Sequence, residues 1–335
     1  MRKEIEERVK VAIGEKVFPG CVIGLVKKDG KREIFPFGAL TYENAAPSVE
    51  EDTVYDVASI TKSIPTASLA ALLIEQGRLS LRNSVRTYLS ELKNDYGATI
   101  EDLLRYRVVG LQMSALAGKT WDEITAHVFE NGFSGPPDTS RYTNLPAFLL
   151  GLIIERVAEK PLDKLAQEHF FKPLGMINTT FSNVRPRRSN IGPTEVDESG
   201  QAICGIVHDE SARVFAKAGR AVGHAGLFST VPDILNFLET LLHYRPRRSI
   251  VEGAEAGLGW QLNDANFMGQ YAGKRTFGKT GFTGTSIVCD LRHSGRAGGI
   301  AFAILSNRTY PKRPPDQNAI NAFRRDIADI ILKNA

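Results

Sequence analysis

The stretch Ser59-Ile60-Thr61-Lys62 joins two segments of different character. Residues 53–58 before it are rich in β-branched and aromatic side chains, which is typical of a strand, and residues 67–74 after it form an apolar run of helical type that ends before Gly77. If the serine and the lysine share a helix, they lie on one face of it, because residues i and i+3 are neighbours on a helix surface. An uncharged amine beside a hydroxyl can take its proton as the oxygen attacks a carbonyl. The stretch therefore predicts a nucleophilic serine with a lysine as its base.

A second Ser-x-x-Lys, from Ser90 to Lys93, shows that the pattern proves little by itself. A chain of average composition is expected to contain it about once or twice by chance. The second copy runs into Asn94-Asp95-Tyr96-Gly97, which is typical of a turn, whereas Ser59 separates a strand-like segment from a helix-like one. This context favours Ser59 as the functional serine.

The composition is that of an ordinary globular protein. Its 335 residues are 42% hydrophobic and 24% charged, which is enough to bury the core of one large domain or of two lobes around a cleft. The formal net charge of +4 is small, and the basic clusters at residues 185–188 and 245–248 are short and interrupted by proline. Solvated loops explain such clusters better than nucleic-acid binding, so no nucleic acid is expected as a partner.

Residues 1–13 alternate charged and apolar side chains at helical spacing, which predicts a surface helix rather than a signal peptide. No uninterrupted apolar stretch approaches the roughly 20 residues that cross a bilayer. We therefore expect a cytoplasmic protein without a membrane partner.

The three cysteines, Cys21, Cys204 and Cys289, are far apart and form no Cys-x-x-Cys pattern. This spacing favours neither a disulfide framework nor a zinc site, so three buried thiols are expected. His208-Asp209-Glu210 offers metal-binding side chains, but three adjacent residues of a regular element cannot all face one ion. We interpret this segment as a loop anchor, and we predict no metal and no organic cofactor.

Strand signals stand at both ends of the chain. Residues 21–27 and 33–40 flank Lys28-Asp29-Gly30-Lys31, whose central Asp-Gly pair indicates a hairpin turn. Residues 286–290 and 299–306 are again strand-like. One sheet built from both termini follows from this arrangement.

Helical periodicity dominates the middle of the chain, and a last amphipathic helix is predicted over about residues 316–333. These signals predict an α+β fold, with an antiparallel sheet flanked by helices and a helical lobe inserted into it. We place the sheet lobe at residues 1–58 and 265–335, and the mainly helical lobe at residues 59–264. The active site is expected in the cleft between the lobes.

Two further patterns lie downstream of Ser59. Tyr142-Thr143-Asn144 places a phenol that can relay a proton beside an amide that can hold a substrate carbonyl. A similar Tyr42-Glu43-Asn44 follows the first hairpin directly, which leaves it less freedom to reach a cleft. Within residues 277–285, Lys279-Thr280-Gly281 combines a glycine that allows close backbone approach with side chains that can bind a carboxylate.

The patterns Ser-x-x-Lys, Tyr-x-Asn and Lys-Thr-Gly occur in this order, each at an element boundary. With tyrosine in the second pattern, the chain resembles the class C β-lactamase group, which also holds D-alanyl-D-alanine peptidases and family VIII esterases. Further stretches resemble that group along most of the chain, namely residues 79–85, 151–157, 171–176, 223–230 and 257–260. The resemblance implies a β-lactamase/transpeptidase-like fold.

The resemblance also implies catalytic roles for the matching residues. Ser59 is the expected nucleophile and Lys62 its activating base. Tyr142 is expected to pass the proton to the leaving group and to help activate water. The backbone N–H groups of Ser59 and Phe282 are expected to form the oxyanion hole.

Substrate binding is implied for a second set of positions: Asn144, Lys279, Thr280, Gly281 and Phe282. Asn144 is expected to hold the substrate amide, while Lys279 and Thr280 bind a carboxylate. Relatives often carry histidine at the position of Lys279, so the lysine favours substrates that bear a carboxylate.

Several features depart from the group or stand outside its motifs. Pro65 lies within the helix that Ser59 should open, which predicts a kink or a shifted helix start. Residues 106–111 stand where the group carries His-Thr-Ser-Gly-Leu, so a different cleft wall is expected. Thr143 replaces the usual serine, which is a mild change. His224, in a glycine-rich turn, is interpreted as a packing or cleft-lining residue.

The sequence thus predicts a serine hydrolase that cleaves a small amide, a β-lactam or a D-amino-acid peptide, through an acyl-enzyme on Ser59. A family VIII-type carboxylesterase acting on short-chain esters is one alternative. A penicillin-binding or sensing protein that is acylated without efficient turnover is another. The expected partner is a small molecule that carries a carboxylate, and the oligomeric state is not predicted.

Overall fold

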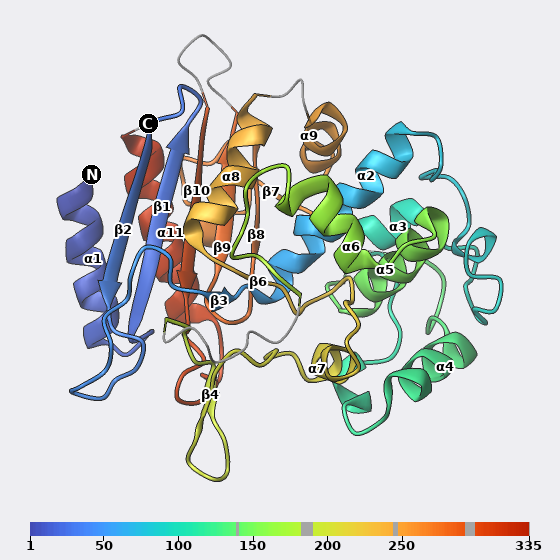
Figure 1. Ribbon diagram of the computed structural model, residues 1–335. Coiled ribbons are helices and arrows are strands. Elements are labelled where there is room, and N and C mark those ends of the chain that lie inside the picture. Colours follow the sequence, from blue (N-terminus) through green and yellow to red (C-terminus); the bar gives the residue numbers. More distant parts are fainter. Residues whose placement is uncertain (139–140, 182–189, 244–246, 292–298, 335) are drawn as a thin grey trace.

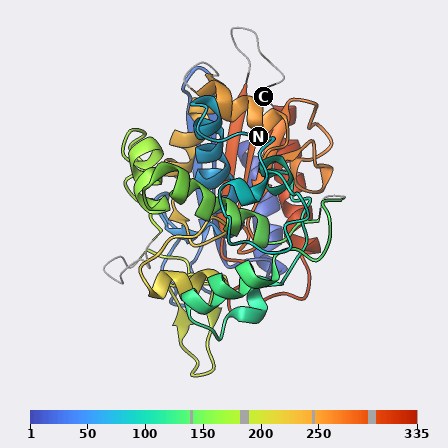
Figure 2. The ribbon, with the colours of Figure 1, turned by 90° about the vertical axis from the view of Figure 1, so that its right-hand side faces the viewer.

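The computed structural model describes residues 1–138, 141–181, 190–243, 247–291 and 299–334. The basic cluster at 185–188 lies outside these ranges, as do Arg245 and Pro246 of the second cluster. Figure 1 shows a sheet with helices against it on one side of the molecule, and a group of mostly shorter helices on the other side. Both termini lie on the sheet side, near each other, in Figures 1 and 2.

The central sheet is antiparallel and has the strand order β2-β1-β10-β9-β8-β7. Its strands are β1 (Gly20–Lys27), β2 (Arg32–Gly38), β7 (Gln261–Leu262), β8 (Thr276–Thr280), β9 (Ser286–Asp290) and β10 (Ile300–Ser306). The strand β1 pairs with β10, from Cys21 opposite Ser306 to Lys27 opposite Ile300. The predicted sheet built from both ends of the chain is confirmed. So is the first hairpin, where Gly30 has a φ of 85° that favours glycine.

Helices cover both faces of this sheet. The helices α1 (Arg2–Gly14) and α11 (Asn318–Lys333) share an apolar cluster with Ile23 of β1 and Phe302 of β10. The helix α8 (Val231–Leu242) packs against β1 and β10 from the other face. Because both faces are covered, β1 and β10 are buried almost throughout and do not alternate between apolar and polar residues.

The remaining elements belong mostly to the middle of the chain. The α-helices are α2 (Ser68–Glu75), α3 (Ile100–Leu104), α4 (Trp121–Asn131), α5 (Leu145–Ala158), α6 (Leu162–Ala166), α7 (Glu210–Lys217), α9 (Arg248–Glu255) and α10 (Ala265–Met268). Shorter helical turns are Ala58–Lys62, Ser63–Ala67, Val85–Thr87, Met113–Leu116 and Gln167–Phe171. Two small ladders pair β3 (Tyr55–Asp56) with β6 (Phe228–Ser229), and β4 (Glu195–Val196) with β5 (Ala202–Ile203). The α+β class is confirmed, while the lobe boundaries stay a prediction.

The helix after the serine begins later than the apolar run suggests. Ser59 and Lys62 lie in a 3₁₀ turn, Ala58–Lys62, whereas α2 starts only at Ser68. Between them Ile64 is extended, with φ −117° and ψ 110°. A proline disfavours helical angles in the residue before it, and Pro65 follows Ile64 directly. A continuous α-helix from Ser59 onward is therefore not formed, and the kink or shifted helix start predicted from Pro65 is confirmed.

Cys21 and Cys289 are buried, but Cys204 is exposed, so the prediction of three buried thiols is wrong for this residue. Cys204 directly follows β5, in the small β4–β5 hairpin that projects from the body of the molecule in Figure 1. In the described ranges, no helix is both long enough and apolar enough to cross a membrane.

Candidate active site

A cleft of about 920 Å³ opens where strand β8 faces the helical part of the chain. Among the residues that line it are six of the predicted site residues: Ser59, Tyr142, Asn144, Lys279, Thr280 and Phe282. Lys62 is only 1% exposed and contacts Ser59 from below the cleft surface. Gly281 is buried at the end of β8, where a Cβ atom would overlap the carbonyl oxygen of Val57. The structure thus brings together residues from three separate segments.

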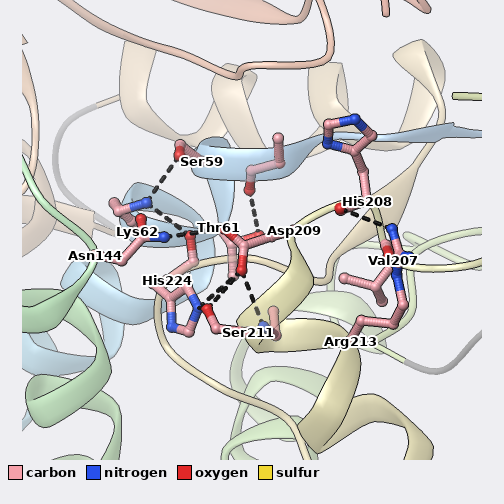
Figure 3. Close-up of polar contacts among 12 residues, drawn as sticks. Ser59, Thr61, Lys62, Asn144, Val207, His208, Asp209, Ser211, Arg213 and His224 are labelled. Carbon is pink, nitrogen blue, oxygen red and sulfur yellow. Dashed lines mark hydrogen bonds and ion pairs between the residues drawn. The ribbon is translucent and has the colours of Figure 1, made fainter. Parts of the chain in front are cut away.

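The side chains of Ser59 and Lys62 are paired within their 3₁₀ turn. Lys62 Nζ lies 2.8 Å from Ser59 Oγ and donates a second hydrogen bond, also of 2.8 Å, to the carbonyl oxygen of His224. Figure 3 shows both contacts. The carbonyl therefore holds the amine in place against the hydroxyl.

The residue before the serine has an unusual backbone conformation. Ala58 has a φ of 48°, in the left-handed region that residues with a Cβ rarely adopt. Its N–H donates to Asp56 Oδ1 at 2.8 Å, and Thr61 Oγ1 donates to its carbonyl oxygen at 2.7 Å. These bonds hold the turn that presents Ser59 to the cleft. Backbone strain of this kind concentrates at functional sites.

The break in the helix at Pro65 leaves the serine–lysine pair intact. Both side chains belong to the turn that ends at Lys62, before the break at Ile64. The segment across the break is anchored by Ser63 Oγ, which donates to the Gly259 carbonyl at 2.7 Å, and by Thr66 Oγ1, which donates to the Gly223 carbonyl at 2.9 Å. Tertiary hydrogen bonds therefore replace those that a continuous helix would supply.

Tyr142 stands between two lysines. The Nζ atoms of Lys62 and Lys279 lie 5.1 Å and 4.6 Å from the centre of its ring. Desolvation of the phenol raises its pKa, but the two ammonium groups and hydrogen bonds with Ser59 and Lys62 outweigh this effect, so the pKa of Tyr142 is lowered from its ordinary value. A phenol tuned in this direction exchanges a proton more readily near neutrality.

Lys279 is buried at the end of β8, with 1% of its surface exposed. Desolvation, helped by the charge of Lys62 and opposed by Tyr142, lowers the pKa of Lys279 to about 8. The amine thus stays mostly protonated at neutral pH and carries a positive charge at the floor of the cleft.

Tyr106 is a site residue that the motifs did not predict. Lys279 Nζ lies 4.5 Å from the centre of the Tyr106 ring and donates to its hydroxyl at 3.4 Å. The Tyr106 and Tyr142 rings are 5.2 Å apart, so the Lys279 ammonium lies against two aromatic rings. Tyr106 itself has a φ of 55°. Its one sequence signal is the departure at residues 106–111, where a different cleft wall was expected.

Asn144 is held by a residue that the motifs also left out. Its Nδ2 donates to Asp209 Oδ2 at 2.9 Å, as Figure 3 shows. Asp209 is the N-cap of α7, where its Oδ1 accepts from the Ala212 N–H at 2.9 Å and from Ser211 Oγ at 2.7 Å. The aspartate therefore joins a helix start to the Tyr-x-Asn motif.

The residues before and after Asp209 in the sequence contact other partners. His208 Nε2 lies 3.4 Å from Glu195 Oε1, and Glu210 forms an ion pair of 2.6 Å with Arg313. Three adjacent side chains thus face three different groups, which is the anchoring role expected of this segment. In the part of the chain that the structure describes, no group of three or more His, Cys, Asp or Glu residues is placed to hold a metal ion.

The two N–H groups expected to form an oxyanion hole belong to Ser59 and Phe282. In the described ranges, neither N–H donates to a backbone carbonyl outside its own helix or strand. The ring of Phe282 stacks on His208, with centres 5.7 Å apart, and the guanidinium of Arg308 lies 4.8 Å from the same ring. Arg308 Nε also donates to the Phe282 carbonyl at 2.8 Å, which fixes this residue beside the cleft.

An antiparallel sheet from both termini, with a serine–lysine pair in the cleft beside it, is the architecture of the β-lactamase/transpeptidase class of serine hydrolases. A sequence model of the family described as Beta-lactamase matches residues 2–326. The chain belongs to this family, and it is a serine hydrolase.

Proteins that are similar to this chain in sequence or in fold have names that state different activities. The N-acetylmuramyl-L-alanine amidase of Bacillus subtilis is 26% identical over 92% of this chain and 81% of its own length. A β-lactamase/D-alanine carboxypeptidase from Pseudomonas syringae superimposes with a TM-score of 0.73 at 18% identity, over 96% of this chain and 97% of its own. EstCE1, a hydrolase with promiscuous acyltransferase activity, has a TM-score of 0.75 at 19% identity, over 99% and 98% of the two chains. At these identities the two solved structures show the fold alone, and the predicted β-lactamase/transpeptidase-like fold is confirmed.

Proposed function

We propose that this protein cleaves a small amide that carries a carboxylate, through an acyl-enzyme on Ser59. The observation that carries the proposal is the contact of 2.8 Å between Lys62 Nζ and Ser59 Oγ in a cleft that Tyr142 and Lys279 also line. A serine becomes a useful nucleophile only when a neighbouring base can take its proton. Lys62 is in the position to do so.

Different residues around the serine carry out the successive proton transfers of the reaction. Once the Lys62 amine has given up its proton, it accepts the Ser59 proton while Oγ attacks the substrate carbonyl, and the N–H groups of Ser59 and Phe282 stabilise the negative oxygen that forms. Tyr142, whose pKa is lowered, passes a proton to the leaving nitrogen as the carbon–nitrogen bond breaks. Water then attacks the ester on Ser59, gives up its proton to the same relay and releases the acid.

Lys279 supports a substrate with a negative charge. With its pKa lowered to about 8, it is mostly protonated at neutral pH, and it lies next to Thr280, which lines the same cleft. A cation in a partly desolvated site binds a carboxylate more strongly than one in water does. β-Lactams and peptides that end in a D-amino acid carry such a group beside their amide.

An esterase that acts on short-chain esters is the second candidate. Lys279 is 1% exposed and lies against the rings of Tyr106 and Tyr142, and its Nζ donates to the Tyr106 hydroxyl. A cation enclosed in this way has less surface to offer a carboxylate, which would favour uncharged esters. The likeness in fold to EstCE1 supports testing this class.

The test is the intact mass of the protein over time after mixing with nitrocefin or with a p-nitrophenyl short-chain ester. We expect a transient adduct on the wild type, with product released, and no adduct on Ser59→Ala. Faster turnover of nitrocefin would favour the amide, and faster turnover of the ester would favour the esterase. A lasting adduct would point to a penicillin-binding protein instead, and turnover retained by Ser59→Ala would overturn the proposal.

The cytoplasmic location expected from residues 1–13 stays a prediction. Fractionation of cells that express the protein with its native amino terminus would test it.

A further inference from the structure

We propose that Asp209 is a positioning residue that orients Asn144 and, through His224, supports the carbonyl that holds Lys62. Asp209 stands outside the three motifs and comes from the start of α7. The inference rests on the proposed function, because it concerns the same cleft. It assigns a role in catalysis to a residue of the His208-Asp209-Glu210 segment, which the motifs leave without one.

The two carboxylate oxygens of Asp209 have different partners. Oδ1 accepts from Ala212 N–H and Ser211 Oγ, which is what a helix N-cap requires. Oδ2 accepts from Asn144 Nδ2 at 2.9 Å, which a cap does not require. The second oxygen therefore serves the cleft rather than the helix.

This contact decides which way the Asn144 amide faces. A carboxylate only accepts hydrogen bonds, so it selects the orientation with Nδ2 toward Asp209. The Oδ1 atom and the second N–H of Asn144 are then left for the substrate. Desolvation by itself raises the pKa of Asp209, but hydrogen bonding with His224, Ala212 and Ser211 holds it well below the ordinary range. Asp209 is therefore ionised, and its preference for Nδ2 persists throughout the working pH range.

The second branch runs through His224, which is fully buried. The Ser211 hydroxyl donates to Asp209, so its oxygen accepts from His224 Nε2 at 3.0 Å. Nε2 also lies 3.4 Å from Asp209 Oδ1, and the ring packs edge-on against Phe148. Because the ring is held on these sides, the carbonyl of the same residue stays in place to accept from Lys62. In Figure 3 dashed lines join Asp209 to Asn144 and to His224, and join Lys62 to the carbonyl of His224.

The substitution Asp209→Asn separates the two tasks of the carboxylate. Asparagine caps helices about as well as aspartate does, so the oxygen of the new amide can stay on the Ala212 N–H. Its NH₂ group then faces the NH₂ group of Asn144, and Asn144 must turn over or move away. Loss of a hydrogen bond to a charged group should lower kcat/KM about ten- to a hundredfold. Most of the loss should appear in kcat, with little change in the unfolding midpoint.

A double-mutant cycle with Asn144→Ala tests whether the effect passes through the amide. If Asp209 acts by orienting Asn144, adding Asp209→Asn to the Asn144→Ala variant should lower its activity by at most about twofold, because there is no amide left to orient. Because Asp209→Asn leaves an oxygen in place for the contacts of Oδ1, losses that multiply would show that the Oδ2 contact does not act through Asn144, and would overturn the proposal.

Asp52→Asn is the matched control. Asp52 Oδ1 accepts from Asn190 Nδ2 at 2.8 Å, so the same substitution removes the charge from the same kind of asparagine–carboxylate contact away from the cleft. We expect its kcat/KM to stay at the wild-type level. A loss in Asp209→Asn no larger than in this control would refute the positioning role.

Asp209→Ser covers the case in which the asparagine variant folds poorly. Serine is a good N-cap, but its side chain is too short to reach Asn144 as well. It should lose about as much activity as Asp209→Asn, and a fully active serine variant would overturn the inference. Failure of the proposed function has a different signature, because Ser59→Ala would then retain turnover whatever the Asp209 variants do.

Discussion

The chain contains two Ser-x-x-Lys segments in very different surroundings. In the first, Lys62 is 1% exposed and its Nζ contacts both Ser59 and a backbone carbonyl. In the second, residues 90–93, the side chain of Lys93 is 61% exposed and forms an ion pair of 2.7 Å with Glu130. The same spacing of serine and lysine thus produces a buried pair in one place and a surface ion pair in the other.

The partner of the amine explains the difference. A carboxylate stabilises the positive charge of the surface lysine and draws it away from the serine. A carbonyl oxygen orients the amine of Lys62 without adding a full negative charge, and the turn around Ala58 directs the amine to the serine. The surroundings of the lysine therefore distinguish a candidate active site from a chance Ser-x-x-Lys pattern. Matching variants in the two segments test this distinction directly.

The largest expected effect comes from the two serines. Ser59→Ala removes the nucleophile and should lower kcat by about 10⁴-fold or more, because the groups of a catalytic unit fail together. Ser90→Ala should leave steady-state rates within about twofold of the wild type, which is the scatter expected for an exposed substitution. Equal losses in the two variants would remove the distinction between the segments.

Next come the two lysines. Lys62→Met keeps an unbranched side chain of similar length but removes the base, and general-base catalysis typically contributes about 10²–10⁴-fold. Lys93→Met should change only stability, by up to about 1 kcal/mol, because exposed ion pairs contribute little. Initial rates together with denaturant unfolding of both variants measure this contrast. Full activity of Lys62→Met would exclude it as the base.

The pH dependence tests the second buried lysine. The pKa of Lys279 is about 8, so its positive charge is present below that pH and is lost as the pH rises through it. For a substrate with a carboxylate, KM should rise above about pH 8, whereas KM for an uncharged ester should show no such increase. Lys279→Gln should abolish the difference between the substrates. Identical KM profiles for both substrates in the wild type would mean that Lys279 does not bind the carboxylate.

The smallest expected effect comes from Tyr106→Phe. This change keeps the ring beside Lys279 but removes the hydroxyl that accepts from its Nζ at 3.4 Å. Loss of one hydrogen bond should lower kcat/KM about two- to tenfold. The substitution should also lower the pKa of Lys279, because the protonated amine loses an acceptor. KM should then begin to rise at a lower pH. Tyr96→Phe, at an exposed tyrosine beside the second Ser-x-x-Lys, is the matched control and should change neither quantity.

Much of the fold and of the candidate site could be predicted from local patterns. Turn residues and apolar periodicity act over a few positions, and they placed the strands at the two ends and the helical middle. Three short motifs predicted five of the residues that line one cleft, and Phe282, next to the third motif, is a sixth. The same patterns missed Tyr106 and Asp209, because neither residue belongs to a motif and both act on partners far along the chain. They also placed Ser59 at the start of a helix that begins only at Ser68.

By itself the sequence determined the class of the protein, because its strands, helices and motifs are specified by residues that are close together in the chain. Only the tertiary structure decided which serine is built into a site. The carbonyl that holds Lys62 is 162 residues away, and the acceptor that orients Asn144 is 65 residues away. Contacts of this range depend on how the whole chain packs, because an amine or an amide is directed by whichever group the fold places beside it, and no local pattern specifies that group.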